Sequence, residues 1–82
     1  HIDVNKGDNN GNTPFIAVCH NGHPEIVKIL MKETRIDVNK SNKYGSKPFM
    51  FACAFGHIEI VTHLMEDKRV DLNQSDNNGS TP

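Results

Sequence analysis

Cys19, His20 and His23 are the residues whose side chains and close spacing could hold a metal ion. Zinc in structural sites takes four Cys, His or carboxylate ligands, which usually come from two short motifs. No CxxC or HxxxH motif elsewhere in the 82 residues completes such a set. We therefore expect no metal site and no other cofactor.

Catalytic chemistry has equally little support in the sequence. No Ser, His and acid set, glycine-rich phosphate loop or paired-carboxylate arrangement occurs at a recognisable spacing. His63 is expected to be a partly exposed packing residue and not a catalytic base. The sequence therefore predicts that the chain is not itself an enzyme.

The elements around these residues repeat with a period of 34 residues. Residues 3–36 and 37–70 are identical at 16 of 34 positions, and the identities keep the same order along the chain. Such a period predicts an array in which each unit packs on its neighbours. The matched pairs include Gly11 with Gly45, Pro14 with Pro48, Phe15 with Phe49 and Cys19 with Cys53.

Each unit contains the signals of two helices. Thr13 is a preferred residue for capping a helix that begins at Pro14, and Gly22 is a preferred residue for ending it. A second helix should begin near Pro24, with Glu25 in its first turn. In each helix one face is apolar and predicted to pack inward: Phe15, Val18 and Cys19 in the first, and Ile26, Val27, Leu30 and Met31 in the second.

Net charge and hydropathy exclude several classes of partner. The formal net charge is −1, so no whole-chain field attracts the protein to phosphate backbones or anionic lipid. No apolar run approaches the roughly 20 residues of a membrane-spanning helix. We expect a partner that is neither nucleic acid nor membrane.

Residues 11–15 (GNTPF), 22–27 (GHPEIV) and 37–39 (DVN) resemble the ankyrin repeat. The resemblance covers the whole chain. It implies an all-α ankyrin-repeat solenoid of stacked helix-turn-helix units with projecting β-turn or hairpin fingers. Two departures stand out: Lys47 replaces the family's capping Thr, and one residue more than the usual 33 lies within residues 32–36.

The resemblance divides the chain into a partial unit 1–10, repeats 11–44 and 45–78, and a partial unit 79–82, which together form one domain. The chain opens on the closing phrase of a unit and stops on an opening phrase, so we expect a fragment of a longer array. Arrays generally need at least about three repeats and polar terminal caps. The exposed end units would allow head-to-tail self-association.

Ankyrin repeats usually meet a protein partner at the turn tips and along the outward side of the first helix. The resemblance therefore implies a binding function, and the alternatives are a substrate-positioning or regulatory segment of a larger enzyme and a purely structural spacer. The positions that match this surface are Lys43, Tyr44, Ser46, Phe51, Ala54, Phe55, Asn10, Asn12, His20 and Asn21.

Two features of this surface have alternative interpretations. Phe51 and Phe55 are four residues apart and share a helix face, where they are either binding anchors or packed beneath a neighbouring turn tip. Lys40, Lys43 and Lys47 make the middle turn tip basic, which suits an acidic partner or only a solvated loop. Cysteines at equivalent positions are expected to be reduced, which favours an intracellular and more specifically cytoplasmic location.

Overall fold

A computed structural model describes residues 3–72 of the chain. This range contains four helices: α1 (Pro14–Asn21), α2 (Pro24–Met31), α3 (Pro48–Ala54) and α4 (Ile58–Glu66). No strand occurs in it, which confirms the expected all-α fold. The end of the predicted repeat 45–78 and the partial unit 79–82 lie outside the described residues.

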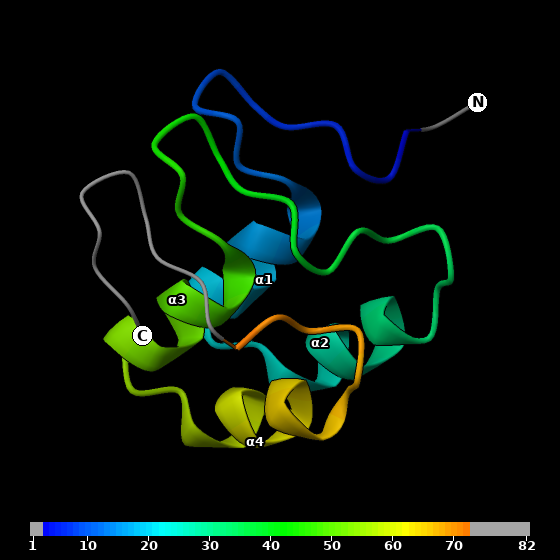
Figure 1. Cartoon of the computed structure of the whole chain (residues 1–82), viewed down its shortest axis with the longest axis vertical. Coiled ribbons are helices and arrows are strands. Elements are labelled where there is room, and N and C mark those ends of the chain that lie inside the picture. The colour runs from blue at the N-terminus through cyan, green and yellow to red at the C-terminus, as the bar shows by residue number, and fades with distance from the viewer. Residues whose placement is uncertain (1–2, 73–82) are drawn as a thin grey trace.

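The helices form two antiparallel pairs that stack on each other (Figure 1). α1 packs beside α3, and α2 packs beside α4, so that the first helices form one layer and the second helices another. The loops that precede α1 and α3 project to the same side of the molecule (Figure 1). The chain therefore has the expected helix-turn-helix units with projecting fingers.

The boundaries of α1 follow from its end residues, as predicted. Thr13 Oγ1 accepts a hydrogen bond from the Ile16 amide at 3.1 Å and satisfies one of the free amides of the first turn. Gly22 follows the helix with φ of 76° and ψ of 46°, a left-handed conformation that costs a glycine little. Its amide donates to the carbonyl of Val18, which closes the helix.

The core lies between the two layers and is shared by both helix pairs. It contains Phe15, Cys19 and Val27 from the first pair, and Ala52, Ile60 and Leu64 are among its residues from the second. The apolar face predicted for α2 is only partly covered, because Val27 is fully buried whereas Ile26 is 43% exposed. The two sides of this face therefore have different neighbours.

The turn after each second helix contains an acidic residue paired with an arginine two positions later. After α2, Glu33 accepts hydrogen bonds from Arg35 Nε and Nη2 at 3.0 and 3.2 Å. After α4, Asp67 accepts from Arg69 Nε and Nη2 at 3.0 and 2.7 Å. These pairs lie where the sequence contains its extra residue, and they give both turns the same shape.

Candidate functional site

The predicted binding residues lie on one continuous part of the molecule, here called the finger–helix face. It consists of the first finger (residues 8–12), the second finger (residues 42–46) and the exposed sides of α1 and α3. The fingers and helices alternate along the chain but lie side by side in space (Figure 1).

Each finger is closed by the residue at its base. Asp8 Oδ1 accepts the amides of Asn10 and Asn12 at 2.9 and 3.0 Å. Asn42 Oδ1 accepts the amides of Tyr44 and Ser46 at 2.9 and 3.0 Å in the equivalent geometry. Asp and Asn can both make this bond because each supplies a carbonyl-type oxygen at the same distance from the backbone. The fingers therefore share one conformation despite their different sequences.

The two fingers are bonded to each other. The Lys43 amide donates to the Asn10 carbonyl at 3.0 Å, and Asn42 Nδ2 donates to Asn12 Oδ1 at 2.9 Å. Gly11 makes this approach possible, because a Cβ atom there would lie 2.8 Å from the Lys43 amide nitrogen. The predicted residue Asn12 thus joins the fingers through its side chain, and Asn10 does so through its backbone.

The tip of the second finger presents Tyr44, Lys43 and Ser46 differently. Tyr44 is 56% exposed, and the Lys43 ammonium lies 5.1 Å from the centre of its ring, at cation–π distance. Ser46 is half-buried at the base of the finger. Tyr44 is therefore the large side chain that this tip presents to a partner.

Phe51 and Phe55 pack against His20 of the neighbouring unit. The His20 ring meets Phe51 edge-on at 5.5 Å between centroids and Phe55 edge-on at 4.6 Å. The two phenylalanine rings are parallel at 6.5 Å. Phe51 is half-buried, whereas Phe55 remains 54% exposed. The rings of His20, Phe51 and Phe55 are called the aromatic cluster below.

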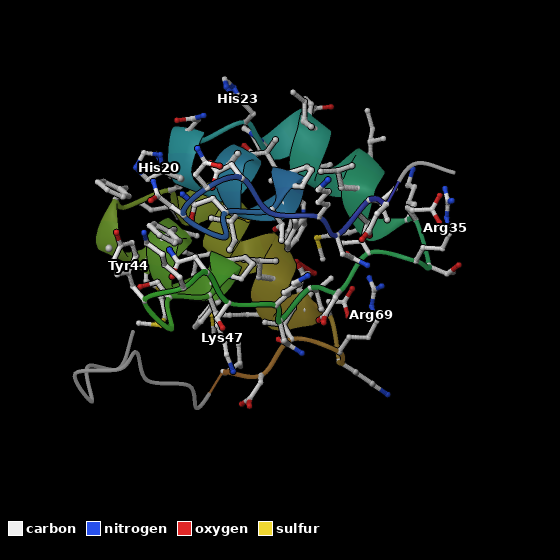
Figure 2. The ribbon with its side chains drawn as sticks, turned by 90° about the horizontal axis from the view of Figure 1, so that it is seen from above. His20, His23, Arg35, Tyr44, Lys47 and Arg69 are labelled. Carbon is white, nitrogen blue, oxygen red and sulfur yellow. The ribbon has the colours of Figure 1, made fainter. Side chains whose placement is uncertain are left out.

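The remaining predicted residues flank the aromatic cluster. Asn21 is exposed, and its Oδ1 lies 3.1 Å from His20 Nδ1, which helps to orient that ring. Ala54 is exposed on α3 next to Phe55. Figure 2 shows His20 and Tyr44 at the same end of the molecule.

His57 is a residue of this region that was not predicted. Its Nε2 lies 2.9 Å from the His20 carbonyl, and its ring lies 6.3 Å from that of Phe55. Gly22 leaves room for it, because a Cβ there would lie 2.6 Å from His57 Cε1. The signal in the sequence was the repeated Gly-His pair, whose histidine reaches back to the preceding unit.

Charge is unevenly distributed over the chain and favours the positive sign on this face. Residues 9–24 contain no Asp, Glu, Lys or Arg, and residues 38–58 contain three lysines and no acidic residue. Lys40 donates to the Asn5 carbonyl at 2.9 Å, which leaves Lys43 and Lys47 as the basic groups nearest the second finger and α3. The face is therefore mildly basic in a chain whose net charge is −1.

The residues that suggested metal or nucleophilic chemistry lie in different environments. Burial raises the pKa of the Cys19 thiol to about 12 and also raises the pKa of Cys53, so both thiols are poor nucleophiles. His23 is exposed at the start of α2, away from the buried Cys19. Within residues 3–72, no three His, Cys, Asp or Glu side chains form a group able to hold a metal ion. His63 is half-buried on α4, 3.8 Å from Glu59.

Comparison with known proteins identifies one family. The family model for ankyrin repeats (3 copies) matches residues 1–82. No curated protein matches the chain at a significant level. None of the helices within residues 3–72 has the length and hydrophobicity that crossing a bilayer requires.

Proposed function

Because the chain belongs to the ankyrin-repeat family, whose members are generally protein–protein interaction modules and typically non-catalytic, we propose that it binds another protein through the finger–helix face. The observation that carries this proposal is the exposure of Phe55. More than half of its surface is open to solvent although His20 and Phe51 fix the position of its ring. Aromatic side chains at the centre of an interface commonly supply much of its binding energy.

The rigidity of the face supports the same proposal. The fingers are bonded to each other by the Lys43 amide and the Asn42 side chain, and the aromatic cluster joins α1 to α3. A surface that is ordered before binding loses less conformational entropy when a partner binds. We propose Phe55 and Tyr44 as the apolar contacts, and Lys43 and Lys47 as groups that favour acidic side chains on the partner.

The charge and the thiols bear on the setting of this interaction. A net charge of −1 disfavours nucleic acid and anionic membrane as partners. Cys19 and Cys53 are both free thiols, and Cys19 is buried. Free thiols persist in reducing compartments, which supports the proposal of an intracellular location, with the cytoplasm favoured.

A photo-crosslinking amino acid in place of Phe55 tests the binding proposal directly. We expect a covalent adduct with a partner protein from position 55, and none from the same amino acid placed at Thr62, which is exposed on α4. Phe55→Ala should then weaken binding of that partner by about tenfold or more. Equal adducts from both positions, or adducts from Thr62 alone, would contradict binding through the finger–helix face.

A second candidate function is head-to-tail self-association, which we propose from the burial of equivalent residues. Ile60 is 1% exposed, whereas Ile26, its equivalent in the first helix pair, is 43% exposed. Met65 is 57% exposed, whereas its equivalent Met31 is half-buried. Each helix pair thus buries the side that faces its neighbour within residues 3–72 and exposes the other side. Light scattering across a dilution series tests whether a second copy covers these exposed sides.

A further inference from the structure

The two helix pairs are joined by a contact between an arginine side chain and a helix end. Arg69 Nη2 donates to the Met31 carbonyl at 2.7 Å, at the last residue of α2. The same nitrogen donates to Asp67 Oδ2 at 2.7 Å, and Arg69 Nε donates to Asp67 Oδ1 at 3.0 Å. Asp67 thus holds the guanidinium in the position where it meets a backbone carbonyl of the preceding unit. We call this arrangement the arginine clamp.

The first helix pair contains the parts of a second arginine clamp. Arg35 and Glu33 stand 34 residues before Arg69 and Asp67. Arg35 Nε and Nη2 donate to Glu33 Oε1 and Oε2 at 3.0 and 3.2 Å, so the guanidinium is held in the same way. Within residues 3–72 it meets no helix carbonyl, and the Arg35 side chain is 65% exposed. The clamp is formed but its carbonyl acceptor is missing from this part of the chain.

The surface next to Arg35 has the shape and composition of one side of the internal contact. A groove of about 480 Å³ lies there, and Val4, Leu30 and Ile36 are among its apolar lining residues. The equivalents of these three residues in the second unit are Val38, Leu64 and Val70, which are 4%, 0% and 8% exposed. They lie in the core shared by the two helix pairs. The groove thus repeats a surface that a neighbouring unit covers elsewhere in the same chain.

The complementary surface lies at the other end of the chain. Val61 and Met65 are the equivalents of Val27 and Met31. Val27 is fully buried, whereas Val61 is only partly buried and Met65 is 57% exposed. This end therefore repeats the surface that receives Arg69 inside the chain, including the helix-terminal carbonyl of residue 65.

We propose that Arg35 forms the arginine clamp of a head-to-tail contact between two copies of this chain, donating to the Met65 carbonyl of the second copy. The inference rests on the self-association proposed above and names the residue that sets its register. A second copy is the occupant we infer, because both end surfaces repeat the two sides of a contact that exists within the chain. Because the two surfaces differ, the contact does not close on itself and leads to linear oligomers.

The clamp and the finger–helix face are separate surfaces. Figure 2 shows Arg35 and Arg69 at the end of the molecule opposite His20 and Tyr44. A change at one surface should therefore leave the other intact. This separation allows failure of the clamp to be distinguished from failure of partner binding.

Sedimentation velocity over a concentration series tests the clamp. The natural chain should form oligomers, and Arg35→Ala should weaken their association by about tenfold, as expected for loss of a hydrogen bond from a charged donor. Arg35→Lys should weaken it nearly as much, because one ammonium cannot reproduce the planar donor arrangement that meets both Glu33 and the carbonyl. Two controls should associate like the natural chain: Lys68→Ala, which removes a charge from an exposed turn, and Phe55→Ala.

Each outcome assigns success or failure to a particular contact. Unchanged association of Arg35→Ala would overturn the clamp alone. A natural chain that stays monomeric at every concentration would overturn both the clamp and the self-association, without bearing on crosslinking at position 55. Association that depends on Phe55 and not on Arg35 would place the contact on the finger–helix face and overturn the clamp. Circular dichroism of every variant checks that the helices are retained.

Discussion

Lys47 occupies a helix-capping position that its side chain does not serve. It precedes α3 with φ of −110° and ψ of 162°, and its side chain accepts no amide of the first turn. At the equivalent position before α1, Thr13 has φ of −78° and ψ of 166°, and its hydroxyl accepts the Ile16 amide. The corresponding Met50 amide donates instead to the Lys47 carbonyl at 3.0 Å, which tightens the first turn of α3. Lys47→Thr should therefore supply the missing cap.

The expected gain can be worked out from the first unit. A threonine at an N-cap stabilises a helix by about 1 kcal/mol relative to a residue that cannot cap. The backbone at Lys47 is already extended, so the substitution needs no rearrangement of the chain. For a domain of this size, about 1 kcal/mol raises the thermal midpoint by roughly 4–8 °C. With an m-value of about 1.5 kcal/mol/M, it raises the urea midpoint by roughly 0.7 M.

Urea unfolding followed by circular dichroism measures this gain. Lys47→Val is the matched control, because valine has the shape of threonine without the hydroxyl and removes the same charge. Lys47→Thr should be about 1 kcal/mol more stable than Lys47→Val. Equal stability of the two variants would refute the reasoning that a missing hydroxyl weakens the start of α3.

Two further predictions concern contacts between the units. Asn39→Ala should lower the free energy of unfolding by about 1–2 kcal/mol, measurable by urea unfolding, because Asn39 Nδ2 donates to the Arg69 carbonyl at 2.7 Å and Asn39 Oδ1 accepts the Asp71 amide at 2.9 Å; an unchanged value would show that water replaces both bonds. Arginine hydrogen bonds lower the pKa of Asp67, and that of Glu33 to about 2, so the unfolded chain binds protons first and stability should fall as the pH drops from about 4.5 towards 2. Thermal midpoints over this range should fall less steeply for Asp67→Asn than for the natural chain, and parallel curves would contradict this assignment.

Local structure could be predicted well from the sequence because its causes are local. Thr13, Pro14 and Gly22 lie in the predicted roles at the ends of α1. The inward face of α1 was predicted less completely, because Ile16 is also 1% exposed. A spacing of three and four residues describes one stripe of the helix, whereas α1 has α2 on one side and α3 on another. Two neighbours bury a wider face than one stripe.

The binding surface could be predicted by position but not by contact. The spacing of Phe51 and Phe55 was enough to place both rings on one side of α3. That His20 lies between α1 and these rings depends on how the helix pairs stack. The same stacking lets His57 reach the carbonyl of His20 and brings the fingers into contact. These contacts join residues at least 30 positions apart, which no local pattern specifies.

The sequence by itself determined the repeated unit, its helices and its family, because periodicity, capping and apolar spacing act within one unit. Only the tertiary structure decided what each repeated residue does. Ile26 and Ile60 are the same residue at the same place in two units, yet one is 43% exposed and the other 1%. Arg35 and Arg69 likewise share their acidic partner type but differ in whether they reach a helix end. The physical reason is that burial and hydrogen bonding at these positions depend on the neighbouring unit, which the local sequence does not encode.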